Sequence, residues 1–289
     1  MGRLYVYTEE WNNVISCLEQ LTKPPYAYSL TKDYFDNFDL EHEYNSESIF
    51  EVAYQKIGAA TGRWDQETAN TMMTTPMNRT FASNDVGGWD VINCNEKMLD
   101  ILTSELDRDG NFDVRTRVGV AWNYSGCIYY MNPFTETVTL TNQSKIFIRK
   151  YTYCNYLEKE KVPESEINVR AYRYANVLLF LAEAELNTEN KTKAIGYLNQ
   201  VRERANLNLL PLDSTEEEVK QDLIKQRAIE FFCEGERFYD LRRWGLLEDE
   251  IKKIGGDRAA SFQQKHYYLP IPSQEIQTNK LCEQSLEWR

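Results

Sequence analysis

The sequence predicts a mostly α-helical fold in which helical hairpins frame a long, loop-rich insert with short strands. Two stretches far apart in the chain each carry the apolar periodicity of a pair of helices, and a further long helix follows the second pair. Between the pairs, residues 54–163 are irregular and rich in Gly, Asn, Asp and Thr. At 289 residues the chain is long enough to bury a sizeable core.

The two helix pairs are copies of one pattern. In the first pair, residues 3–21, a helix end and a turn precede an amphipathic helix; in the second, a helix at 173–188 is followed by its partner at 191–207. Aligned copies place Gly2 opposite Ala182, and Val14, Ile15 and Leu18 opposite Ala194, Ile195 and Leu198. Small residues at such positions let two helices approach closely, as in tetratricopeptide repeats. We therefore expect two tetratricopeptide-like hairpins.

The first hairpin begins at its small residue, Gly2, so the front half of its leading helix is absent from the pattern. A hairpin cut in this way leaves the face of its second helix poorly covered. We expect four apolar residues to be more exposed than their counterparts in the second hairpin: Leu4, Val6, Val14 and Leu18. The pattern also predicts that the chain is the C-terminal part of a longer protein. Its first residues, MGRLYVYTEEW, lack the basic and apolar regions of a signal peptide.

The insert contains a few local signals. Residues 48–54 alternate apolar and polar side chains like a short strand, and residues 95–105 are a helix candidate. The stretch 107–113 places acids at alternate positions, as a calcium loop does. However, Gly110 falls at position 4 rather than 6, and Val118 occupies the position of the bidentate Glu. We interpret this stretch as a polar turn.

Composition excludes several partners and cofactors. The net charge of −12 argues against nucleic acid and anionic membrane surfaces as partners. No run of 18 apolar residues is present, so no transmembrane helix is predicted. The six cysteines are scattered and there are two histidines, His42 and His266, so we expect no metal site. Motifs for nucleotide cofactors are absent from the sequence, and no cofactor is expected.

Aromatic residues of the insert are the best candidates for ligand binding. No sequence motif of a hydrolase or metallopeptidase is present, which argues against an enzyme. Sugar rings stack on flat aromatic side chains while fixed polar groups bind their hydroxyls. The candidates are Trp64, Trp89, Trp122 and Tyr124, with Trp64 and Trp89 preferred because glycines precede them. The alternative for each tryptophan is a core position.

The stretch 227–245, RAIEFFCEGERFYDLRRWG, combines charges with apolar residues. Glu230, Glu234 and Arg237 stand at helical i, i+4, i+7 spacing, so we expect them on one face of the long helix. Ser214 and Glu217 can form a capping box, which predicts that this helix starts at Ser214. Charges in so apolar a setting must be paired. We expect Glu230 and Glu234 to be buried, with Arg227, Arg237 or Arg243 as partners, in a structural ion network rather than a catalytic group.

This stretch resembles the C-terminal signature of the SusD/RagB family, E-R-x-x-E-L-x-x-E-G-x-R-x-x-D-L-x-R-W. The chain departs from it at Gln226, where the family has Glu, and at Phe231, where it has Leu. The segment ESIFEV and the tail LPIPSQEIQTNKLCEQ also match, and Asp113-Val-Arg115 takes the place of the family's acid-Pro-Arg turn. The signature residues are Arg227, Glu230, Glu234, Gly235, Arg237, Asp240, Leu241, Arg243 and Trp244.

The resemblance implies a function and a division of the chain. It covers the whole chain but only about the C-terminal half of a family member, and it implies one SusD-like region. Its parts are residues 1–21 and 169–207 as hairpins, 22–168 as the ligand-binding part and 214–289 as signature helix and tail. Family members are surface-exposed outer-membrane lipoproteins of Bacteroidetes that bind glycans or peptides and cover a SusC-like TonB-dependent transporter, which the hairpins would face. The alternatives are a soluble tetratricopeptide adaptor for peptides and a polysaccharide-degrading enzyme.

Overall fold

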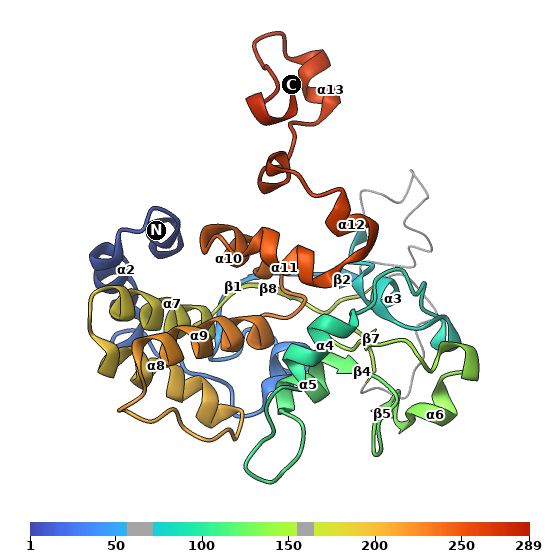
Figure 1. Cartoon of the computed structure of the whole chain (residues 1–289). Helices are drawn as coiled ribbons and strands as arrows, with labels where there is room; N and C mark the ends of the chain where they lie inside the picture. The colour runs from blue at the N-terminus through green and yellow to red at the C-terminus, as the bar shows by residue number, and fades with distance from the viewer. Residues whose placement is uncertain (57–71, 155–164) are drawn as a thin grey trace. The chain divides into compact units, whose positions relative to one another are not determined.

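The computed structural model describes residues 1–56, 72–154 and 165–289 (Figure 1). Trp64 lies outside these residues. The chain divides into two compact units, Met1–Glu234 and Gly235–Arg289. The prediction of a mostly α-helical fold with short strands is confirmed. Within the described ranges, no helix has both the length and the apolar character needed to cross a membrane.

Two helical hairpins form one end of the first unit. They are α1 (Gly2–Tyr7) with α2 (Trp11–Leu18), and α7 (Tyr174–Asn187) with α8 (Lys191–Arg204). The helix α7 packs against α2, α8 and α9 (Glu216–Glu230), and these helices lie side by side in Figure 1. The small residues act as predicted: a Cβ on Gly2 would lie 2.3 Å from Leu18, and Ala182 and Ala194 are buried.

The prediction of an uncovered first hairpin holds clearly for one residue, since Leu4 is 54% exposed. Leu18 is 8% exposed against 0% for its counterpart Leu198, which is a small difference in the predicted direction. Val6 and Val14 are 1% and 0% exposed, so the prediction is wrong for these two. They belong to the same apolar cluster as the buried residues of α7, which cover them.

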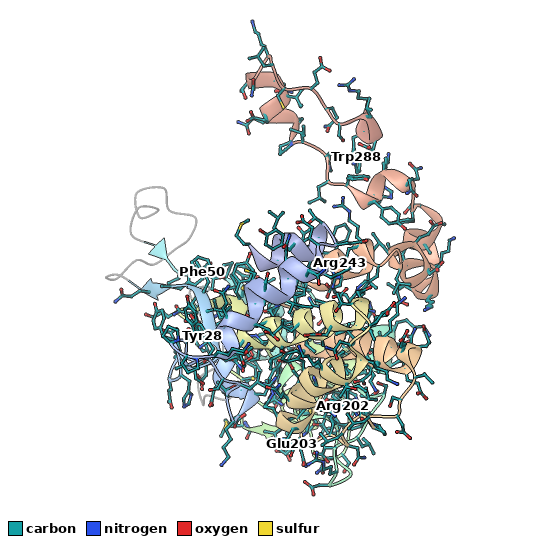
Figure 2. All side chains as sticks on the ribbon, turned by 90° about the vertical axis from the view of Figure 1, so that its left-hand side faces the viewer. Tyr28, Phe50, Arg202, Glu203, Arg243 and Trp288 are labelled. Carbon is teal, nitrogen blue, oxygen red and sulfur yellow. The ribbon has the colours of Figure 1, made fainter. Side chains whose placement is uncertain are left out.

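The insert folds around short strand pairs. In the longest pair, β1 (Ser48–Val52) runs antiparallel to β8 (Val169–Arg173), with the register Phe50↔Tyr172 and an irregularity on either side of Phe50. Phe50 projects from β1 into solvent (Figure 2). The other pairs are β2 (Gln55–Lys56) with β3 (Met72–Met73), β4 (Val120–Ala121) with β7 (Phe147–Ile148), and β5 (Ile128–Tyr129) with β6 (Asn132–Pro133).

Short helices complete the insert. Asn95 caps α4 (Glu96–Leu102), in agreement with the predicted helix at 95–105. The others are α3 (Met77–Phe81), α5 (Val114–Gly119), α6 (Phe134–Thr137) and the 3₁₀ helices η1 (Glu19–Thr22), η2 (Tyr34–Asn37), η3 (Asn84–Val86) and η4 (Leu140–Asn142). Two apolar clusters, one around Phe38 and Tyr151 and one around Tyr129 and Phe147, hold these pieces together. This part of the chain is therefore held together by the packing of buried apolar side chains, since its helices and strands are short.

The long helix α9 starts and ends at different places from those predicted. Its cap is Thr215, which forms a capping box with Glu218, so the predicted box of Ser214 and Glu217 is displaced by one residue. The helix ends at Glu230. Cys233 and Gly235 then adopt φ values of 60° and 82°, a left-handed backbone that an α-helix excludes.

The second unit consists of short helices and a folded tail. It contains α10 (Arg237–Arg243), α11 (Leu247–Ile254), α12 (Gly256–Ala260), η5 (Gln264–Tyr267), α13 (Ser273–Thr278) and η6 (Leu286–Trp288). The side-chain amide of Gln284 bonds both backbone groups of Ile271 at 2.9 Å. This pair explains how the Pro-Ile-Pro segment and the distant Gln of the tail motif belong together.

Candidate functional site

An aromatic cluster stands in the insert. It consists of Phe112, Trp122 and Tyr124, and each of the three is partly exposed. The ring centroids of Trp122 and Tyr124 are 4.2 Å apart, and Phe112 lies 5.1 Å from Trp122 and 5.2 Å from Tyr124. These spacings are those of rings in contact. Two of the four predicted binding residues, Trp122 and Tyr124, are thus brought together.

Local backbone contacts hold the cluster in place. The amide of Tyr124 donates to the carbonyl of Trp122 at 2.9 Å, which turns the chain so that the two rings meet. Arg117 Nε donates to the carbonyl of Phe112 at 2.9 Å. Burial, with the neighbouring Cys127 thiol, raises the pKa of Tyr124 to about 12. The Tyr124 hydroxyl is therefore protonated at neutral pH, and it is hydrogen-bonded to the Cys127 thiol.

Phe112 follows a rigid polar turn. Asp107 Oδ1 accepts hydrogen bonds from the amides of Asp109 and Asn111 at 3.0 and 2.8 Å. Asn206, after the end of α8, donates to Asp109 at 2.9 Å, and Arg108 pairs with Glu203 of α8. The stretch 107–113 is thus a polar turn, fixed to the second hairpin.

The same turn forms one wall of a polar cavity of about 610 Å³. Carboxylates, cations and amides line the cavity, which gives it many fixed hydrogen-bonding groups. The lining residues are Lys32, Asp33, Tyr34, Asp36, Asp107, Asp109, Asn111, Val114, Arg117, Arg204, Ala205 and Asn206. Aromatic rings and a polar cavity therefore flank one turn, an arrangement that suits a ligand with both apolar faces and hydroxyl groups.

Trp89 makes a different contact. The guanidinium of Arg79 lies 5.0 Å from the centroid of its ring, and its amide donates to the Arg79 carbonyl at 2.6 Å. A Cβ on the preceding Gly88 would lie 2.1 Å from the carbonyl oxygen of Ala82. The glycine before Trp89 is thus required by close backbone packing. In the sequence analysis, the glycine before Trp89 was instead the reason to prefer Trp89 as a ligand-binding residue.

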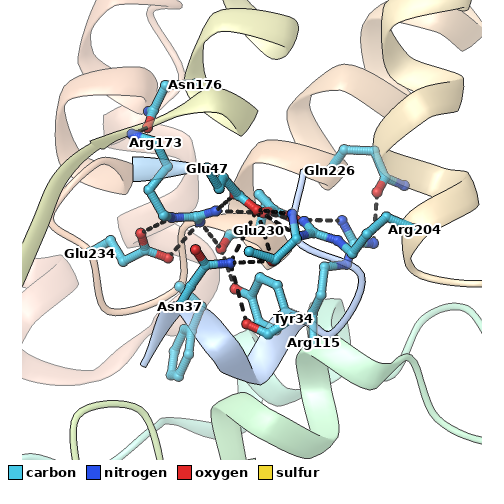
Figure 3. A network of polar contacts seen from close by, with 12 residues as sticks. Tyr34, Asn37, Glu47, Arg115, Arg173, Asn176, Arg204, Gln226, Glu230 and Glu234 are labelled. Atoms are coloured by element: carbon cyan, nitrogen blue, oxygen red, sulfur yellow. Dashed lines mark hydrogen bonds and ion pairs between the residues drawn. The ribbon is translucent and has the colours of Figure 1, made fainter. Parts of the chain in front are cut away.

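Two of the signature residues, Glu230 and Glu234, belong to a buried ion network whose centre is Arg173 (Figure 3). Its guanidinium pairs with Glu47, with Glu230 at 3.0 Å and with Glu234 at 2.8 Å. Figure 3 shows these three carboxylates around it. The side chains of Arg173, Glu47 and Glu230 are 0% exposed, and that of Glu234 is 4% exposed.

Further cations surround Glu230. Arg204 bonds it at 2.6 Å and Arg115 at 3.3 Å, and Arg115 also binds Asp113 at 2.6 Å. The pair Asp113–Arg115, which stands where the family has its acid-Pro-Arg turn, thus joins the network. Lys150 donates to two backbone carbonyls, those of Glu230 and Phe232, and to Glu234 at 3.0 Å. Gln226 accepts from Arg115 at 2.7 Å, so the residue that departs from the family pattern still takes part.

The network shifts the pKa values of Glu230, Glu47 and Lys150. Burial alone raises the pKa of Glu230, but Arg204, Arg173 and Arg115 outweigh it and hold that pKa well below its usual range. The pKa of Glu47 is lowered in the same way, by Arg204 and Arg173 against burial. Burial lowers the pKa of Lys150, and Glu234 opposes that shift.

The predicted arginine partners of Glu230 and Glu234 were wrong. Both carboxylates are buried and paired, but with Arg173, Arg204, Arg115 and Lys150. The guanidinium of Arg227 instead lies over the rings of Phe180 and Phe231, Arg237 pairs with Glu250, and Arg243 with Asp240. The prediction failed because α9 ends at Glu230. Glu234 and Arg237 therefore lie outside that helix and do not share a helical face with Glu230.

Comparison with known proteins identifies the family. Residues 46–288 match the model of the SusD family, and the chain belongs to that family. A SusD superfamily protein from Bacteroides vulgatus is 43% identical, with a TM-score of 0.87 over 99% of this chain and 61% of its own. Surface glycan-binding protein A from Bacteroides thetaiotaomicron, solved in complex with laminarihexaose, is 23% identical, with a TM-score of 0.71 over 98% of this chain and 62% of its own.

A curated relative gives the same result. SusD-like protein P25 from Formosa agariphila is 24% identical over 98% of this chain and 56% of its own length. The chain thus spans between half and two thirds of the length of these relatives.

Sequence reasoning missed two features of this region. Phe112 was overlooked because it stood within the acidic stretch 107–113, although a single aromatic residue next to a rigid turn is a usable signal. The spacing Asp-x-x-Asp-x-x-His, residues 36, 39 and 42, was also overlooked, and the fold brings these side chains together.

Proposed function

We propose that this chain is part of a SusD-like protein that binds glycans without catalysis at the outer-membrane surface and delivers them to a TonB-dependent transporter. The observation that carries glycan binding is that the turn 107–113 contributes both to the aromatic cluster, through Phe112, and to the lining of the polar cavity, through Asp109 and Asn111. Family membership and the glycan named with one structural relative support it.

The chemistry of the site suits a neutral oligosaccharide. Sugar C–H faces stack on aromatic rings, and Trp122 and Tyr124 present two rings at a tilt of 34°. The hydroxyl groups need partners in fixed positions, which the turn and the cavity wall supply through Asp109, Asn111 and Arg117. Trp89 and Trp64 remain further ligand-binding candidates in this proposal.

Calorimetry with a glycan panel that includes laminari-oligosaccharides tests the proposal. Stacking of bases on aromatic platforms contributes about 1–3 kcal/mol per ring, and we take this as the scale for sugars. Trp122→Ala is then expected to weaken binding about 5- to 150-fold. Phe50→Ala, which removes a ring that is 55% exposed on β1, is the matched control and should leave affinity unchanged.

Two results would contradict the site or the function. Full affinity in Trp122→Ala would remove the aromatic cluster as the site, while the glycan-binding function would stand. Release of new reducing ends from the same panel would favour the polysaccharide-degrading alternative.

Delivery to a transporter is the second part of the proposal and rests on family membership alone. Copurification of the longer parent protein with a TonB-dependent transporter from the outer-membrane fraction is the expected result. Recovery of the parent protein in the soluble fraction, bound to peptide tails, would favour the tetratricopeptide adaptor.

A further inference from the structure

Asp36, at the C-terminal end of η2, and Asp39 and His42, on the connector that follows, form a group of potential metal ligands. One ligand atom from each lies within 4.8 Å of the others. His42 Nδ1 is 2.8 Å from Asp39 Oδ2 and 3.5 Å from Asp36 Oδ1. The side chains of His42 and Asp36 are 46% and 26% exposed, so an ion could reach them from solvent.

The spacing of these atoms matches the edges of a coordination polyhedron. Zinc binds imidazole nitrogen and carboxylate oxygen at about 2.0–2.2 Å, which separates neighbouring ligands by about 3.3 Å in a tetrahedron and about 2.9 Å at a right angle. The two distances at His42 Nδ1 bracket these values. The third separation, between the ligand oxygens of Asp36 and Asp39, lies within 4.8 Å.

Residues outside the group fix the backbone that carries it. Arg170 Nη2 donates to the carbonyls of Asp36 and His42 at 3.4 and 3.0 Å, and Arg170 is itself buried against Glu51. The amide of His42 donates to Asp39 Oδ1, which orients that carboxylate and leaves Oδ2 toward the imidazole. Such preorganisation favours metal binding because the ligands need not be ordered by the ion.

We propose that Asp36, Asp39 and His42 bind a divalent first-row transition ion of the zinc type, with water in the remaining positions. The ion replaces the proton that His42 Nδ1 shares with Asp39, and that proton passes to solvent. An imidazole ligand favours zinc-type ions over calcium and magnesium, which prefer oxygen alone. Acidic neighbours, Asp33 and Glu41, add to the attraction for a cation, and the guanidinium of Arg170 opposes it. This site is separate from the proposed glycan site, so either proposal can fail alone.

Titration calorimetry with Zn²⁺ on the 289-residue chain is the test, with His42→Gln and Asp36→Asn as variants. Each is expected to lower the affinity of one zinc equivalent at least tenfold. His266→Gln, which removes the other histidine of the chain, is the matched control and should not change it. Zinc bound by cysteine thiols persists in every variant and therefore cancels in the comparison.

A spectroscopic measurement makes the result independent of folding defects in a variant. With Co²⁺ added to the unmodified chain, the imidazole signals of His42 should show large paramagnetic shifts while those of His266 stay in place. Zinc affinity that is equal in His42→Gln, Asp36→Asn and the unmodified chain would overturn the proposal. So would unshifted His42 signals, or Ca²⁺ binding that is as tight as Zn²⁺ binding.

Discussion

Glu230 accepts hydrogen bonds from three arginine side chains and is fully buried. Glu230→Gln keeps its shape but removes the negative charge that Arg173, Arg204 and Arg115 share, so each arginine keeps only its remaining carboxylate partners, Glu47, Glu234 and Asp113. Breaking a buried ion pair in this way costs about 3–5 kcal/mol, and we expect a loss of that size in the free energy of unfolding from urea denaturation. Glu203→Gln, which breaks the exposed pair with Arg108, is the control and should cost at most about 1 kcal/mol. Equal losses in both variants would contradict the role of burial.

The lowered pKa values of Glu230 and Glu47 predict acid sensitivity. A carboxyl whose pKa is depressed by folding stabilises the protein above its unfolded pKa, about 4.3 for Glu, and this stability is lost as pH falls through the folded pKa. We expect the free energy of unfolding to decline below about pH 5, and to decline less steeply in Glu230→Gln. Asp36 and Glu43, whose pKa values burial raises, act in the opposite direction. If the free energy of unfolding of Glu230→Gln declined with falling pH as steeply as that of the unmodified chain, other groups would control the acid sensitivity.

At the scale of elements, we expect replacement of glycine by alanine to have opposite effects on stability at two positions. Gly196 lies exposed within α8, where a Cβ would meet nothing within 4 Å, so Gly196→Ala should stabilise by about 0.5–1 kcal/mol through helix propensity. Gly235 has a φ of +82° and equally open surroundings, so Gly235→Ala should destabilise by about 1–2 kcal/mol through backbone strain alone. Thermal unfolding of both variants measures this difference. Shifts of the same sign would contradict the left-handed turn after α9.

The elements that sequence patterns predicted well are those with local causes. The second hairpin and the helix at 95–105 follow from apolar periodicity and capping, so their positions agree with α7, α8 and α4. The end of α9 was missed because the residues after Glu230 have a helical pattern of charges. The turn there depends on left-handed residues that periodicity does not reveal. The capping box was displaced by one residue because Ser214 and Thr215 both have an acid three positions later.

The partners within the ion network could not be predicted because they come from distant parts of the chain. Glu230 meets Arg115 and Arg173, which stand 115 and 57 residues away. The periodicity of a single helix can only suggest neighbours within that helix. The ring contact of Trp122 with Tyr124 has a local cause, a tight turn, whereas the cavity beside it is assembled from three separate segments.

At the scale of the whole molecule, which has a net charge of −12, the charge of the ligand determines how its binding depends on salt. A neutral glycan releases no counterions, so we expect its affinity to change less than about twofold between about 50 and 200 mM salt, whereas a protein that neutralises six to ten phosphates loses about 10³–10⁵-fold. Calorimetry at the two salt concentrations checks this. A steep decline with salt would indicate that the ligand is charged and would contradict a neutral glycan.

The position of Glu47 in the network also has a consequence during protein synthesis. Glu47 leaves the ribosome well before its two cationic partners, since Arg173 and Arg204 follow 126 and 157 residues later. At about 5–20 residues per second, the interval before Arg204 is synthesised lasts about 8–30 s. A lone carboxylate cannot enter an apolar interior without compensation, so the segment around Glu47 must stay hydrated over that time. The insert is thus expected to complete its core only after the second hairpin has emerged, which makes the nascent chain a substrate for chaperones until then.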